Sequence, residues 1–148
     1  MTDLEKLRDW LATYPDFDIL SRFQVDYTDQ AVPGNGGLFP TGLVEIARYE
    51  DVLGNITVTN QYNFAIYCVF EKAEGDDVGA VLNADWVMDF QRWAQEQSIR
   101  RRAPQFGNTG EREVIKAQNG LLYEAEGEGT AVYMIQLSIQ FKTFYEEV

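Results

Sequence analysis

Residues 56–70 read ITVTNQYNFAIYCVF and contain the clearest alternating pattern in the chain. Apolar or aromatic side chains occupy most even positions, whereas the odd positions from Thr57 to Asn63 are polar. Successive side chains of a β-strand point to opposite faces, so this pattern predicts a strand with one buried face. Fifteen extended residues would span ~50 Å at about 3.3 Å per residue, and we therefore expect a bulge or bend near Asn60.

The same alternation returns near the end of the sequence and predicts a last long strand, with apolar positions at Tyr133, Ile135, Leu137, Ile139 and Phe141. Four shorter strands are expected over residues 19–27, 43–49, 112–116 and 121–125. Turn-forming residues separate strands at Leu53-Gly54-Asn55, at Asn119-Gly120 and between Gly127 and Gly129. The glycine-rich stretch from Pro33 to Gly37 predicts an irregular loop.

Two other segments have helical spacing. Thr2 and Glu5 have the spacing of a capping box and precede apolar residues that recur up to Leu11, which predicts a short amphipathic helix. A second helix is expected to begin at Asn83, a good N-cap residue, and to end near Arg100. Its inward stripe is expected to contain Leu82, Trp86, Phe90 and Trp93.

The predicted element order is α-β-β-β-α-β-β-β, and 148 residues fit one domain spanning residues 1–148. Strands that follow one another through short turns form antiparallel pairs, and an amphipathic helix must cover an apolar face. We therefore expect an α+β fold, with a largely antiparallel β-sheet and two helices packed on one face.

Composition excludes several classes of function. The chain has 12 Lys and Arg against 24 Asp and Glu, a formal net charge of −12, which opposes binding to nucleic acids or to anionic membranes. It contains no histidine, so Ser-His-Asp and Cys-His nucleophile systems are excluded. Its single cysteine, Cys68, lies on the apolar face of the central strand and is expected to be a buried hydrophobe.

The carboxylates do not form a pattern typical of a catalytic or metal site. Asp85 and Asp89 stand four residues apart on the second helix but lie off its apolar stripe, so we expect a solvated face. Glu74, Asp76 and Asp77 lack the spacing of a calcium loop. We therefore assign no catalytic, cofactor-binding or metal-ligating residues.

Several segments resemble one family across nearly the whole chain. They are Leu7-Arg8-Asp9-Trp10-Leu11, Gln61-Tyr62-Asn63-Phe64, Phe90-Gln91-Arg92-Trp93 before an Arg/Pro segment, Ala131-Val132-Tyr133-Met134-Ile135-Gln136-Leu137, and the closing Phe144-Tyr145. The sequence resembles the minor capsid or tail-terminator proteins of tailed bacteriophages and of prophages of Gram-positive bacteria.

The resemblance implies a structural protein of the virion, present in the host cytoplasm during assembly. It implies a ring, commonly a hexamer, that caps the tail tube and joins it to the head, with tail-tube and head-completion proteins as partners. The family has no catalytic motif to carry over. The resemblance implies no cofactor, no membrane association and no sequence-specific binding of nucleic acid. A head–tail connector or a tail-tube subunit would share much of the same pattern.

Two segments are candidate subunit interfaces. Arg100, Arg101 and Arg102 are the only concentrated positive charge, and they either complement the end of the second helix or dock on an acidic patch of the next protomer. The glycine-rich segment Gly34, Asn35, Gly36 and Gly37 is a candidate for ordering against a neighbouring subunit.

A third segment carries acidic residues on a predicted hairpin. Glu124, Glu126 and Glu128 are expected to keep an exposed sheet edge from aggregating or, in the ring that the resemblance implies, to line the lumen. The alternative function for the whole chain is a small α+β ligand-binding or enzymatic domain with a pocket between helices and sheet.

Overall fold

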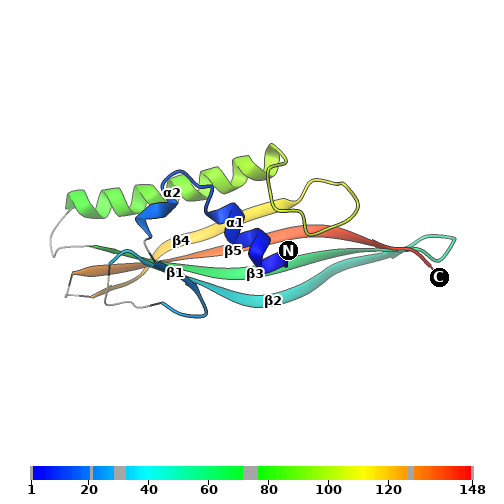
Figure 1. Cartoon of the computed structure of the whole chain (residues 1–148), viewed down its shortest axis with the longest axis horizontal. Coiled ribbons are helices and arrows are strands. Elements are labelled where there is room, and N and C mark those ends of the chain that lie inside the picture. The colour runs from blue at the N-terminus through cyan, green and yellow to red at the C-terminus, as the bar shows by residue number, and fades with distance from the viewer. Residues whose placement is uncertain (1, 21, 29–32, 72–76, 127–128, 148) are drawn as a thin grey trace.

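The computed structural model describes residues 2–20, 22–28, 33–71, 77–126 and 129–147. For residues 77, 119 and 121–126 it describes the backbone and not the side chain. The chain forms an α+β fold, as predicted (Figure 1). In chain order the elements are α1 (Asp3–Leu11), the short 3-10 helix η1 (Phe17–Ile19), β1 (Arg22–Val25), β2 (Asn35–Glu50), β3 (Ile56–Glu71), α2 (Asp77–Ile99), β4 (Val114–Glu126) and β5 (Thr130–Tyr145).

The strands form one sheet in the order β1-β2-β3-β5-β4. The β3–β5 ladder is antiparallel and unbroken from Ile56, which pairs with Tyr145, to Glu71, which pairs with Thr130. The pairs β2–β3 and β4–β5 are antiparallel as well, and only the short strand β1 lies parallel to β2. The prediction of a largely antiparallel sheet is confirmed.

Both helices cover the same face of the sheet (Figure 1). The ring of Trp10 on α1 stacks on Trp93 of α2 with centroids 4.7 Å apart, and the Trp10 indole N–H donates to Gln97 Oε1 at 3.4 Å. The even positions of β3 and the odd positions of β5 form the core beneath them, with Ile66, Cys68, Ile135, Leu137 and Ile139 all fully or almost fully buried. Burying one such aliphatic side chain is worth about 1.5–3 kcal/mol, so the sheet face holds the helices in place.

The start of α1 is confirmed and the start of α2 is not. Thr2 caps α1, because its Oγ1 accepts from the Glu5 N–H at 3.2 Å. Helix α2 begins at Asp77, six residues before the predicted N-cap Asn83. Asn83 lies inside the helix, where its Nδ2 donates to Glu71 O of β3 at 3.1 Å, and Leu82 is exposed rather than part of the inward stripe.

The predicted loop from Pro33 to Gly37 is wrong for its second half, because β2 begins at Asn35. The glycines serve close packing within the sheet. A Cβ on Gly36 would lie 2.6 Å from Phe23 Cδ2, and one on Gly37 would lie 2.8 Å from Tyr27 O. Strand β1 can approach β2 this closely only because those side chains are absent.

The predicted turn at Asn119-Gly120 is also wrong, so the sheet has five strands and not six. Strand β4 runs through both predicted segments, and its register against β5 shifts between Gln118 and Leu121 and again between Leu122 and Glu124. A Cβ on Gly120 would lie 2.5 Å from Val87 Cγ1 of α2. This glycine lets the helix approach the strand.

A bulge or bend was predicted near Asn60 of β3, and the structure places a bulge opposite Asn60 on the neighbouring strand β2. Strand β3 stays in register with β5 at Asn60, whereas the β2–β3 register shifts between Glu45, which pairs with Asn60, and Ala47. Ile46 is therefore the extra residue of a bulge in β2. The predicted turn at Leu53-Gly54-Asn55 is confirmed as the end of the β2–β3 hairpin.

Candidate functional site

The sheet extends beyond the two helices, and the β2–β3 hairpin there forms the most exposed part of the described chain (Figure 1). We call residues 43–58 together with 143–147 the distal arm. Every β2 residue from Pro40 to Glu50 is exposed. The arm presents large apolar side chains to solvent: Leu43, Val44, Ile46, Tyr49, Val52, Leu53, Phe144 and Tyr145.

The tip of the distal arm is held rigidly by hydrogen bonds. Asp51 Oδ1 accepts from the N–H groups of Leu53 at 2.8 Å and Asn55 at 3.0 Å. Desolvation raises the pKa of Asp51, but hydrogen bonds from the Asn55, Leu53 and Gly54 N–H groups outweigh it, so this pKa lies below its ordinary value. Asn55 Oδ1 also accepts from the Glu147 N–H at 2.9 Å, which ties the end of the chain to the turn.

Acidic residues surround the apolar side chains of the distal arm. Glu45 Oε1 and Arg48 Nε form an exposed ion pair at 2.7 Å, because the bulge at Ile46 turns both side chains to one face. Within the described part of the chain, no ion pair includes Glu50, Glu146 or Glu147. The end of the arm therefore carries negative charge that no ion pair between described residues neutralises.

The outer edge of the sheet is protected on β4 and open on the arm. Ser98 of α2 donates from Oγ to Glu113 O at 2.9 Å and accepts at Oγ from the Ile115 N–H at 3.1 Å. Gln91 Nε2 donates to Ala117 O at 2.9 Å, so α2 side chains occupy this edge. Strand β1 pairs with β2 only along Asn35–Leu38, and no other described strand pairs with the outer edge of β2 beyond it. An uncovered strand edge is a template for pairing with another chain.

The predicted arginine cluster lies directly after α2, which ends at Ile99. We call Ile99–Arg102 the arginine corner; all four residues are exposed. Arg100 Nε pairs with Glu96 Oε1 at 2.8 Å, whereas no ion pair between described residues reaches Arg101 or Arg102. The corner thus combines an exposed aliphatic side chain with two cations that have no counterion among the described residues.

The backbone of the arginine corner has a strained but well-bonded conformation. The Arg102 N–H donates to Gln97 O at 2.9 Å and the Arg101 N–H donates to Ser98 O at 3.3 Å, the pattern of a Schellman helix end. Arg101 has φ of 58°, in the left-handed region that glycine usually occupies at this position. Arg101 therefore holds an exposed, charged side chain in a backbone conformation that is unfavourable for residues other than glycine.

The other predicted site residues are placed differently. Asn35, Gly36 and Gly37 are buried inside this chain, which explains the glycines without a neighbouring subunit; their interface role stays a prediction. Glu124 and Glu126 belong to β4, an edge strand, and their side chains are not described; Glu128 lies outside the described residues.

Two predictions about single residues are confirmed: Cys68 is a buried hydrophobe, and Asp85 and Asp89 lie on a solvated face of α2. Cys68 is fully buried, and desolvation raises the pKa of its thiol. Asp85 and Asp89 are exposed on α2. No group of three His, Cys, Asp or Glu residues within the described ranges could hold a metal ion. In the same ranges, no helix is long and apolar enough to cross a membrane.

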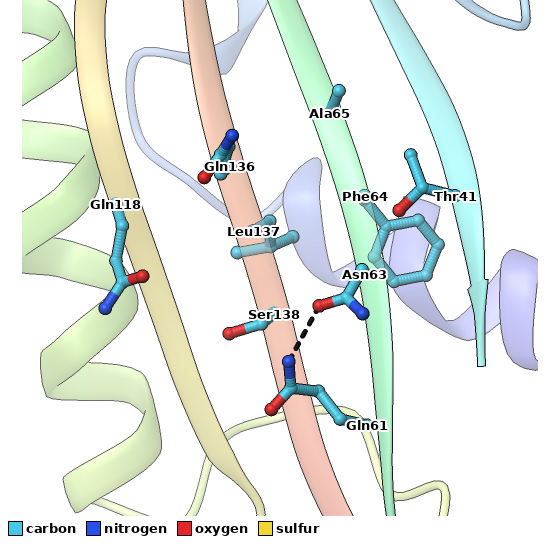
Figure 2. Close-up of a pocket in the computed structure, with 9 residues that line it drawn as sticks. All are labelled: Thr41, Gln61, Asn63, Phe64, Ala65, Gln118, Gln136, Leu137 and Ser138. Carbon is cyan, nitrogen blue, oxygen red and sulfur yellow. Dashed lines mark hydrogen bonds between the residues drawn. The ribbon is translucent and has the colours of Figure 1, made fainter. Parts of the chain in front are cut away.

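Two hollows bear on the alternative of a ligand-binding domain. One, of about 400 Å³, lies on the face of the sheet away from α1 (Figure 2). Its lining is uncharged and mixes amides and hydroxyls, such as Gln61 and Ser138, with apolar residues, such as Phe64. Gln61 Nε2 there donates to Asn63 Oδ1 at 2.8 Å. Another, of about 670 Å³, lies between α2 and the end of β3; its lining includes Phe70, Leu82 and Trp86.

One buried carboxyl group could have supported an enzymatic site. Desolvation raises the pKa of Glu113, against backbone N–H groups of Gly107 and Phe106 that lower it. Its Oε2 has no hydrogen-bond partner among the residues that the structure describes, but Glu113 lines neither hollow. We therefore read Glu113 as part of the packing between α2 and the segment before β4.

The distal arm was not among the predicted site residues. The signal in the sequence is the run LVEIARYEDVL at 43–53, where apolar residues occur at both odd and even positions between charged ones. Such a pattern does not define one buried face. In the structure the β2 part of this run is exposed throughout.

Comparisons with known proteins leave the family open. No protein-family model matches the chain, and no curated protein matches it. One solved structure aligns with 99% of this chain and 100% of its own, at 12% identity and a TM-score of 0.45. A likeness at this level carries no argument about function, and the name of that structure describes none.

Proposed function

We propose that this chain is a structural protein of a tailed phage or prophage that forms a homo-oligomeric ring, as a tail terminator or another head–tail junction subunit, and that it is not an enzyme. The observation that carries the proposal is the distal arm. Its exposed apolar side chains and uncovered strand edge are features of a chain that is completed by a partner. The resemblance to minor capsid and tail-terminator proteins supplies the identity of the assembly.

A terminator requires surfaces and no reactive groups. It must bind the end of a growing tube better than another tube subunit does, and it must leave no equivalent surface for further addition. Contacts between two different surfaces of identical subunits close into a ring when the rotation between subunits allows it. The distal arm and the arginine corner are two such different surfaces in one chain.

The test is the mass of the assembled species, alone and with tail tubes. Reversing Arg100, Arg101 and Arg102 to Glu is expected to lower the oligomer mass at moderate salt, measured by light scattering after size exclusion. The matched control reverses three exposed arginines elsewhere, Arg8, Arg22 and Arg112, with the same change in net charge. An unmodified chain that forms no oligomer, either alone or with tail tubes, contradicts the proposal. An unchanged mass for the first variant, or an equal loss for both, contradicts the role of the arginine corner in the ring.

The hollow between α2 and β3 favours a second candidate, a domain that binds a small apolar ligand. Its volume of about 670 Å³ lies within the ~300–1,000 Å³ range of ligand pockets, and Phe70 and Trp86 line it. Titration with a solvatochromic apolar dye tests this candidate. Saturable binding that Trp86→Ala abolishes would support it, and non-saturable binding would exclude it.

A further inference from the structure

We infer that the distal arm of one copy docks on the arginine corner of the next copy. The inference rests on the proposed function and names the two surfaces that would meet in the ring. Its first support is charge. Glu50, Glu146 and Glu147 at the arm and Arg101 and Arg102 at the corner lack counterions among the described residues, and each surface supplies what the other lacks.

The second support is the apolar content of both surfaces. Val52 is fully exposed and Leu53 is 73% exposed at the tip of the distal arm, and Ile99 is 60% exposed at the arginine corner. Stable interfaces have an apolar centre and a charged or polar rim. Placing Val52 and Leu53 against Ile99 puts the carboxylates of the arm beside the guanidinium groups of the corner.

The third support is that both surfaces are already ordered in the free chain. The Asp51 hydrogen bonds fix the turn of the arm, and the bonds from Arg101 and Arg102 to the last carbonyls of α2 fix the corner. Preformed surfaces lose little conformational freedom on binding, which favours association.

A competing arrangement pairs two arms edge to edge about a two-fold axis. Glu45 and Arg48 lie on one face of β2, so an antiparallel pair could set Glu45 of one copy against Arg48 of its partner. That contact uses one surface twice and would form closed dimers. It gives the cations of the arginine corner no acidic partner, and we therefore favour docking of the distal arm on the arginine corner.

Cysteine cross-linking separates the two arrangements. Cys68 is fully buried, so single cysteines placed by Leu53→Cys and Ile99→Cys are the reactive thiols. Mixing these two variants under mild oxidation is expected to give a disulfide-linked pair, and neither variant alone is expected to give one. Met88→Cys, on a similarly exposed site of α2, replaces Ile99→Cys in the control mixture and is expected to give no pair.

Charge exchange provides the second readout. Glu146→Arg with Glu147→Arg in the Leu53→Cys chain, or Arg101→Glu with Arg102→Glu in the Ile99→Cys chain, is each expected to lower the cross-link yield about tenfold. Mixing the two reversed chains restores opposite charges across the contact and is expected to restore the yield. Recovery in that mixture is not expected from variants that have merely lost their fold.

The outcomes distinguish the inference from the proposed function. Cross-linking of Leu53→Cys with itself, or failure of Leu53→Cys to link to Ile99→Cys while rings of normal mass form, overturns arm-to-corner docking and leaves the ring intact. Absence of any assembly, with or without tail tubes, overturns both. A cross-link that the charge reversals weaken and their combination restores supports the docking.

Discussion

Arg101 combines backbone strain with an exposed charge. A side chain in the left-handed region costs a residue about 1–2 kcal/mol, and glycine removes this cost while adding some freedom to the unfolded chain. Arg101→Gly is therefore expected to raise the free energy of unfolding by about 0.5–1 kcal/mol, measured by urea denaturation. We expect the same variant to form rings less readily, so stability and assembly move in opposite directions.

Arg102→Gly is the matched control for this prediction. Arg101 and Asp26 are the non-glycine residues with positive φ in the described chain, so Arg102 has no strain for glycine to relieve. Arg102→Gly is expected to lower stability slightly, because glycine gains entropy in the unfolded state. Equal effects of the two substitutions on unfolding would contradict the assignment of strain to Arg101.

At the level of elements, the two central strands β3 and β5 were predictable because their signal is local. The alternation over residues 56–70 and 133–141 records which face of each strand is buried, and β3 and β5 follow it closely. The helix cap at Thr2 was predictable for the same reason, since its hydrogen bond closes within three residues.

The glycine positions were misread because glycine has two uses. Gly36 and Gly120 suggested a loop and a turn, but each lies within a strand where a neighbouring element passes too close for a Cβ. The neighbours are Phe23 and Val87, 13 and 33 residues away in sequence. A close approach between distant segments leaves no local pattern, so periodicity alone could not separate these uses.

Protection of the β4 edge by α2 leads to a prediction at this scale. Ser98 is buried and bridges two backbone groups at the start of the β4 edge, the O atom of Glu113, which directly precedes β4, and the Ile115 N–H. Ser98→Ala leaves both groups without this partner, and a buried unsatisfied group costs about 1–3 kcal/mol. We expect a loss of about 2–4 kcal/mol in the free energy of unfolding, measured with urea.

Ser138→Ala tests whether that loss is specific to the edge. Ser138 lies on the open face of the sheet, half-buried beside Gln136 (Figure 2). Its replacement is expected to change stability by less than about 0.5 kcal/mol. If the two serine variants unfold at the same urea concentration, the helix does not protect the edge in the way described.

For the whole molecule, the net charge of −12 sets the condition for assembly. Bringing acidic copies together is opposed by long-range repulsion, so cohesion must come from short-range contacts that place apolar groups and opposite charges together. Added salt acts on both terms: it screens the repulsion between chains and the attraction between exposed arm and corner charges. The apolar part of the contact is therefore the part to remove in a decisive variant.

Val52→Ser with Leu53→Ser removes that apolar part at the tip of the distal arm. Both side chains are exposed in the isolated chain, so the free energy of unfolding of the monomer is expected to change by less than about 0.5 kcal/mol. Burial of an aliphatic side chain is worth about 1.5–3 kcal/mol, so the dissociation constant of the assembly is expected to rise at least about tenfold, measured by sedimentation equilibrium. Val78→Ser with Leu82→Ser makes the same chemical change at exposed positions of α2 and is expected to leave the constant unchanged. Equal dissociation constants for the two double variants would show that the arm does not hold the copies together.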